Sequence, residues 1–182
     1  MSNAVTTGTP GLGRSGRRTR TRRLAFAAGA TLSGALLWSP VALAVIDCST
    51  TVPSLAFGTY DPTLASPTDI TTSMTVTCTR GVLESWTVSY SVELSTGSSG
   101  TYASRRMNAG AARLNYNVYT NASRSQVWGN GTSSTGVLST TMNFNFFQFS
   151  KSATHTAYGR MPAGQNANPG SYGDNLVVTL TF

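Results

Sequence analysis

The sequence predicts an all-β fold, a sandwich of two sheets built from short strands. Glycine, serine, threonine and asparagine are abundant, and only 10% of the residues are charged. β-Branched and aromatic residues recur at every second position in short runs, and the spacing of three and four that marks an amphipathic helix is absent. One such run closes the chain, where Leu176, Val178, Leu180 and Phe182 share one face of an extended segment.

The N-terminal residues 1–44 have the features of a removable secretory signal peptide. Six arginines lie between Arg14 and Arg23, an apolar stretch runs from Leu24 to Leu37, and the small-residue motif ends at Ala44. This order predicts cleavage after Ala44 and export of a single domain, residues 45–182. The apolar stretch is shorter than the roughly 20 residues that a spanning helix needs, so we expect no membrane span in the mature chain.

Removal of the signal peptide changes the meaning of the net charge. The whole chain has 13 basic and 6 acidic residues, and six of the basic ones belong to the signal peptide. The remaining 7 basic and 6 acidic residues give the mature domain a net charge of +1. A nucleic-acid-binding domain needs clustered lysine and arginine on its working surface, so we expect no nucleic-acid partner.

The first half of the domain contains three expected strands. Residues 55–60 form the first, which the Asp61-Pro62 turn ends. Residues 70–78 alternate and carry Cys78 inward. The third covers residues 85–94, where one face contains the apolar side chains Trp86, Val88, Tyr90, Val92 and Leu94.

The second half contains four more expected strands. Residues 114–118 alternate, and residues 142–149 carry phenylalanine at both parities, which indicates that both faces are covered or that a bulge intervenes. Residues 153–160 are expected to pair with this run. After a loop at 162–172, residues 175–182 form the closing strand. About seven strands separated by turns are typical of an immunoglobulin-like sandwich.

The closing strand is expected to leave one sheet edge uncovered, because no residue follows Phe182 in this sequence. An open apolar edge promotes aggregation unless another chain covers it. We therefore expect the strand to need a partner.

The two cysteines of the chain, Cys48 and Cys78, both lie in the exported domain. In an oxidising compartment an even pair forms one disulfide most simply. The sequence contains no CxxC motif and no cluster of cysteine and histidine, so neither redox catalysis nor zinc binding is expected.

The residues that could support catalysis are few. His155 is the single histidine and is expected to be an exposed strand residue without a nucleophile beside it. The aspartates lie at turns, where local hydrogen bonding explains them better than a pair of catalytic carboxylates. The Arg105-Arg106 pair is expected at a solvated strand end, and Trp128 in the core. We expect no enzymatic activity and no cofactor.

Several runs, taken in order, resemble the spore coat protein U domain family, whose members include subunits of archaic chaperone–usher pili. Together they cover nearly the whole mature chain, and the order of the set is more specific than any one run. The matching runs are residues 55–62, 76–78, 102–107, 114–120, 127–131, 158–165 and 170–174, followed by the closing strand.

The resemblance implies an incomplete immunoglobulin-like sandwich that lacks its final strand. In this family, a periplasmic chaperone lends the missing strand, an outer-membrane usher assembles the subunits, and a neighbouring subunit then replaces the chaperone strand. It implies that Leu176, Val178, Leu180 and Phe182 belong to the strand that binds the chaperone and assembles the fibre. The expected location is the cell surface or an extracellular fibre.

One departure leaves the role within the assembly open. Donating a strand takes about five alternating residues, whereas cleavage after Ala44 leaves only three before Cys48. The leading function is a structural subunit that serves adhesion or biofilm formation. The alternatives are a tip adhesin that binds a surface or glycan, a free-standing secreted coat protein, and a donor chain cleaved upstream, for example after Ala30.

Overall fold

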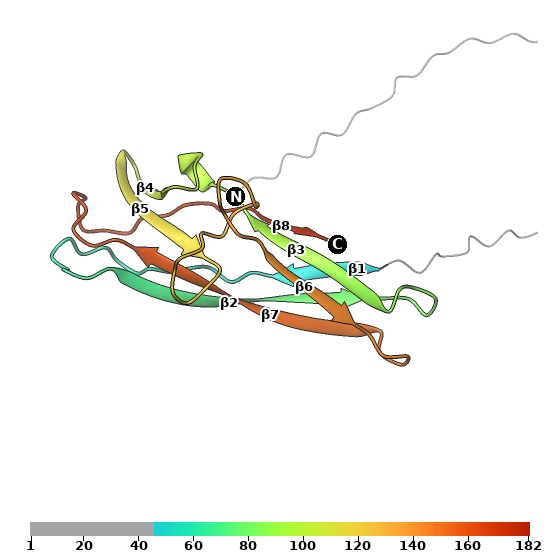
Figure 1. The fold of residues 1–182 in the computed structure, drawn as a ribbon. Helices are drawn as coiled ribbons and strands as arrows, with labels where there is room; N and C mark the ends of the chain where they lie inside the picture. Colours follow the sequence, from blue (N-terminus) through green and yellow to red (C-terminus); the bar gives the residue numbers. More distant parts are fainter. Residues whose placement is uncertain (1–45) are drawn as a thin grey trace, which may run out of the picture. The chain divides into compact units, whose positions relative to one another are not determined.

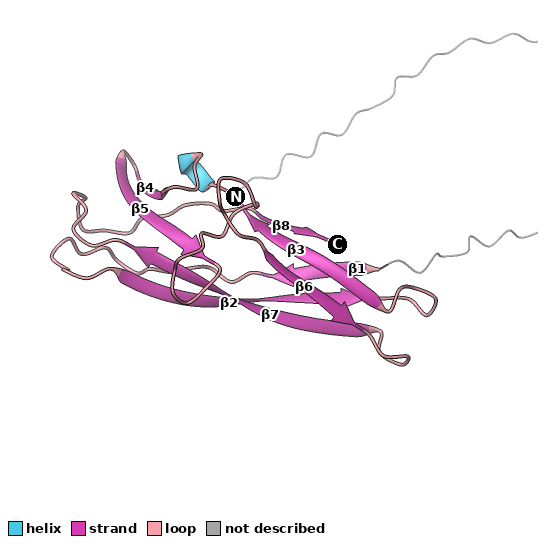
Figure 2. Ribbon diagram, in the orientation of Figure 1, coloured by secondary structure: helices cyan, strands magenta, loops and turns pink. Residues whose placement is uncertain are grey.

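The computed structural model describes residues 46–182, so the expected signal peptide and its cleavage site at Ala44 lie outside the described residues. Eight strands and one short 3-10 helix make up this domain (Figures 1 and 2). They are β1 (Asp47–Thr51), β2 (Thr68–Thr79), β3 (Thr87–Leu94), η1 (Gly97–Ser99), β4 (Arg105–Ala109), β5 (Ala112–Tyr119), β6 (Leu138–Asn143), β7 (Ser150–Met161) and β8 (Val178–Thr181).

The strands form two antiparallel sheets. The larger has the order β1-β2-β7-β5-β4, and the smaller has the order β6-β3-β8. The longest ladder joins β2 to β7, from the pair Thr68–Met161 to the pair Thr79–Ser150 without a break. The all-β sandwich that the sequence predicts is therefore confirmed, and no helix within residues 46–182 is long and apolar enough to cross a membrane.

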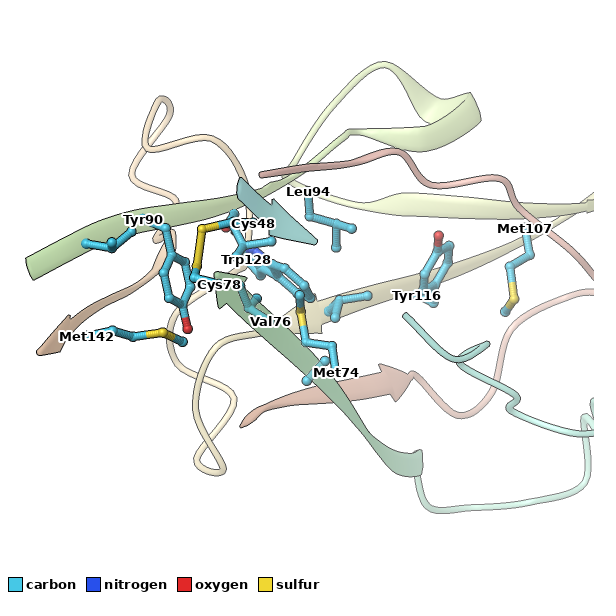
Figure 3. Close-up of a cluster of buried hydrophobic side chains, with 14 of the residues drawn as sticks. Cys48, Met74, Val76, Cys78, Tyr90, Leu94, Met107, Tyr116, Trp128 and Met142 are labelled. Atoms are coloured by element: carbon cyan, nitrogen blue, oxygen red, sulfur yellow. A yellow bond between two sulfur atoms is a disulfide. The ribbon is translucent and has the colours of Figure 1, made fainter. Parts of the chain in front are cut away.

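The core fills the space between the two sheets because both present apolar residues at every second position. Buried side chains alternate with exposed or half-buried ones along β2 and β3. The disulfide between Cys48 and Cys78 lies in this cluster (Figure 3). Trp128 is buried in it as well, as expected. Its main members are Met74, Val76, Tyr90, Val92, Leu114, Tyr116, Val118, Trp128 and Met142.

Three expectations about individual strands are wrong. Residues 55–60 form no strand and join no sheet, apart from an isolated bridge at Tyr60. Their alternation arises because Leu55 and Phe57 pack against the core. The run 142–149 leaves its strand at Asn143 and continues as a turn, so its phenylalanines occupy a loop. β7 pairs with β2 and β5 rather than with this run.

The third expected strand is right except at its start. β3 begins at Thr87, and Val88, Tyr90, Val92 and Leu94 are all buried. Trp86 precedes the strand and is 52% exposed, so it does not join the core face.

Candidate functional site

The strand β8 forms one edge of the smaller sheet and is hydrogen-bonded only to β3 among the described strands. The Ser95 amide donates to the Val177 carbonyl at 3.0 Å. Backbone groups alternate in direction along an antiparallel strand, so those of Thr179 and Thr181 also face β3. The N–H and C=O groups of Val178 and Leu180 therefore point to the open side, where another strand can bind them.

The strand β1 forms the opposing edge, at the end of the larger sheet. Cys48 lies directly across from Cys78 of β2, and the expected disulfide joins the two strands at this pair. Both cysteines are buried. The disulfide thus fixes the edge strand β1 to the long β2–β7 ladder.

The chain continues from β1 along the same side of the sandwich. The Phe57 ring meets the Tyr116 ring edge-on, with centroids 5.7 Å apart. Atoms of Leu55 and Phe57 each lie 2.9 Å from the position that a Cβ at residue 159 would occupy. Gly159 of β7 therefore allows this segment to approach the sheet closely.

A groove of about 550 Å³ lies between residues 52–57 on one side and residues 172–178 on the other. We call these two segments its lips. The groove is closed at one end, where the Tyr60 amide donates to the Gly170 carbonyl at 2.9 Å and the rings of Tyr60 and Tyr172 pack edge-on. Its floor is mainly apolar and consists of Thr72, Leu94, Met107, Tyr116, Val118, Trp128 and Ala157.

β1 and β8 are the edge strands of different sheets and are not paired with each other. Some of their Cα atoms nevertheless lie within 8 Å of each other. Two strands that flank a third in one sheet lie nearly 10 Å apart, because neighbours are spaced by 4.7–4.9 Å. A strand inserted between β1 and β8 must therefore move these edges apart.

The buried guanidinium of Arg105 connects three segments beneath the groove floor. Arg105 has no exposed surface and donates to Ser95 O at 2.9 Å, to Asn117 Oδ1 at 2.6 Å and to Trp128 O at 2.6 Å. Burial lowers the pKa of its guanidinium. The expectation of a solvated arginine at this position is wrong, because three neutral oxygens replace water around the side chain.

The start of the C-terminal lip is fixed by Asp174. This carboxylate accepts a hydrogen bond from the Tyr116 hydroxyl at 2.8 Å and another from the Ser98 amide at 3.0 Å. Burial, followed by the bond to Asp174, raises the pKa of Tyr116. Local sequence does not predict these contacts, because neither partner is near Asp174 in the chain.

The predicted assembly residues do not all face the core. Leu176, Val178 and Leu180 are half-buried against it, whereas their neighbours Thr179 and Thr181 are exposed. Phe182 departs from the expectation, because it is 53% exposed. It lies beyond the end of β8 and outside the pairing that holds the preceding residues.

The histidine is not an exposed strand residue. His155 is half-buried on β7, and its Nε2 lies 2.7 Å from the hydroxyl of the buried Tyr90 on β3. Burial lowers the pKa of His155. The expectation failed because its partner comes from the other sheet, 65 residues away in the chain.

The carboxylates of Asp61 and Asp69 have structural partners rather than a catalytic pairing. Asp61 accepts hydrogen bonds from the amide and hydroxyl of Thr63. Asp69 binds the guanidinium of Arg160 through both oxygens at 2.7 Å and lies 3.3 Å from Arg124. Within residues 46–182, no group of three or more histidine, cysteine, aspartate or glutamate side chains could hold a metal ion.

Comparisons with known proteins agree with this architecture. One solved chain, from the chaperone–tip adhesion subunit pre-assembly complex of the archaic Csu pili of Acinetobacter baumannii, has a TM-score of 0.50 and 22% identity. The match covers 76% of the present chain and 40% of that chain, and it establishes similarity of fold.

Sequence similarity identifies the family. Protein U of Myxococcus xanthus is 33% identical over 136 residues, which cover 71% of this chain and 72% of the relative. Residues 34–179 match the Spore Coat Protein U domain. The chain therefore belongs to the Spore Coat Protein U domain family.

Proposed function

We propose that this protein is an exported structural subunit of an extracellular pilus or coat, assembled by the addition of a partner's strand along β8. A periplasmic chaperone supplies the strand first, and another subunit replaces it at the outer-membrane usher. The observation that carries the proposal is the edge strand β8: its Val178 and Leu180 backbone groups point to the unpaired side, and an apolar groove reaches this edge at Val178.

The groove matches the chemistry of strand addition. An incoming strand with apolar residues at alternate positions can form main-chain hydrogen bonds to β8 and place side chains over Leu94, Tyr116 and Trp128. Each hydrogen bond contributes about 0.5–1.5 kcal/mol net. Burial of each large apolar side chain contributes about 1.5–3 kcal/mol. A bound strand of about five or six residues makes several such contacts, and their sum is expected to give a long-lived complex.

We propose no catalytic role for this groove. The polar groups of the groove are engaged in structural contacts, as Arg105 and Asp174 illustrate. A free-standing coat protein is the second candidate, because the family that matches this chain is named for a spore coat protein. The two candidates differ in whether the subunit joins a fibre.

Co-expression tests the proposal. Expressed alone, residues 45–182 should aggregate or be degraded, because the groove and the β8 edge are open. Co-expression with a chaperone from the same gene cluster, or fusion of an alternating apolar peptide after Phe182, should give a soluble monomer. A stable monomer that unfolds cooperatively without any added strand, and that binds no chaperone, would contradict strand addition.

A further inference from the structure

A second apolar surface lies outside the groove, on the loops that follow β2 and β6. We call residues 80–86 and 144–149 the aromatic end. Of the eleven large apolar side chains exposed among the described residues, six belong to it, and Leu83 and Phe147 are 97% and 85% exposed. The six are Val82, Leu83, Trp86, Phe146, Phe147 and Phe149.

A single buried arginine holds the two loops together. Arg80 is 5% exposed and donates hydrogen bonds to backbone carbonyls of both loops: Asn145 at 3.0 Å and Gln148 at 3.1 Å in one, and Glu84 at 3.4 Å in the other. Its guanidinium also lies 5.4–5.7 Å from the ring centroids of Trp86, Phe144 and Phe149. The loops therefore form a built surface and present their apolar side chains in a fixed arrangement.

The arrangement of the rings excludes a flat sugar platform. Trp86 and Phe146 meet at 57°, and Phe146 and Phe147 meet at 88°. The charged residues of the aromatic end, Arg80 and Glu84, carry opposite signs. This surface suits an uncharged apolar face of another protein.

The aromatic end and the open end of the groove lie at the same end of the sandwich. Thr181 of β8 pairs with Ser91, and β3 begins four residues earlier, directly after Trp86. The last residues of β8 therefore run towards the aromatic end, as Figure 1 shows. Three more exposed apolar residues, Val52, Val177 and Phe182, lie on the lips or just beyond β8. A strand bound along β8 thus leaves the groove on the side of the aromatic end, because the Tyr60–Gly170 contact closes the other side.

We propose that the aromatic end is a second docking surface for the periplasmic chaperone, which contacts it with its folded body while its strand occupies the groove. The inference rests on the proposed function. A chaperone that bound only the groove would leave most of the exposed large apolar side chains of this subunit in water. Covering both surfaces with one partner protects the subunit from aggregation until assembly.

The test compares the whole chaperone with its isolated strand. The chaperone complex of the double variant Leu83→Ser/Phe147→Ser is challenged with excess donor peptide, and the rate of chaperone release is measured. Both side chains are almost fully exposed, so the variant should fold normally. Loss of one buried large apolar side chain corresponds to roughly ten-fold faster dissociation, so the double variant should release the chaperone at least ten-fold faster.

Two controls separate the possible outcomes. Leu64→Ser removes an apolar side chain that is 48% exposed and lies outside the aromatic end, and it should leave the release rate unchanged. The isolated donor peptide should dissociate from the double variant and the wild type at equal rates.

Equal chaperone release by the double variant and the wild type would overturn the inference and leave the groove intact as an assembly site. The double variant could keep the wild-type rate of chaperone release and yet bind hydrophobic surfaces or other copies of the chain less well. In that case the aromatic end binds a different partner, and the inference is wrong. If the wild type forms no chaperone complex at all, both this inference and the proposed function fail.

Discussion

The β2–β7 ladder and the β8 edge show how one domain separates stability from assembly. β2 and β7 are paired over twelve residues each, and each strand also has a neighbour on its other side. β8 has four paired residues and an open side. The long ladder has its main-chain groups paired on both sides, whereas the short edge leaves main-chain groups for a partner. We expect changes in the two regions to have different effects on unfolding and on partner binding.

The largest effect should come from a charge on the inward face of the edge. Val178→Asp or Leu180→Asp places a carboxylate against the core, at a cost of several kcal/mol unless it is protonated or paired. The yield of purified chaperone–subunit complex should fall to near zero. Thr179→Lys and Thr181→Lys point to solvent and should give the wild-type yield. Equal losses from both pairs would show that the side-chain facing is wrong.

Removal of the disulfide should destabilise the fold strongly. It closes a loop with a sequence separation of 30 residues, and its loss in small exported domains costs about 2–5 kcal/mol. The double variant Cys48→Ala/Cys78→Ala should therefore show a lower midpoint of denaturant unfolding when complemented with a donor strand. An unchanged midpoint would mean that the β1–β2 pairing holds without the bond.

A smaller effect should follow from Gly159→Ala. The added methyl would lie 2.9 Å from atoms of both Leu55 and Phe57, and the lip formed by residues 52–57 would have to shift. Overpacking of this kind costs about 1–3 kcal/mol. Because the lip borders the groove, donor-peptide affinity should fall together with stability. Gly170→Ala provides a control for the glycine-to-alanine change itself, since its φ lies outside the left-handed region and the nearest atom to its added Cβ, Tyr172 Cε2, is 4.0 Å away.

The smallest effect should come from the pH dependence of His155. Burial lowers the pKa of His155 below the ordinary histidine value of 6.5, so the unfolded chain binds more protons near and below that pH. The stabilisation is complete above about pH 6.5 and is lost as the pH falls towards the lower pKa of the folded state. The unfolding midpoint of the complemented domain should drop between pH 7.5 and pH 5, and His155→Gln should reduce this slope. An identical slope in the variant would assign the dependence to other groups.

The sequence was informative where one residue type has one usual environment. Alternation along 70–78 and 87–94 correctly predicts the buried faces of β2 and β3, because strand side chains alternate and both sheets cover one core. The same reasoning predicts the half-buried face of Leu176, Val178 and Leu180.

Prediction from the sequence failed where a polar side chain finds its hydrogen-bond partners in distant chain segments, and where an apolar side chain stays exposed. Arginine is expected in water, but the acceptors around Arg105 come from residues 95, 117 and 128. Phenylalanine is expected in a strand or core, but Phe146 and Phe147 lie in a loop that Arg80 holds from 65 residues away. Local periodicity contains no information about such partners.

Amide hydrogen exchange at β8 tests the central claim most directly. In dilute domain freshly released from its chaperone, before it can aggregate, we expect the Val178 and Leu180 amides to exchange freely, and we expect them to become protected when a donor strand is added. The Thr179 amide, which faces β3, should be the better protected of the three before addition. Protection of Val178 and Leu180 before the strand is added, or no gain after it binds, would contradict assembly along this edge.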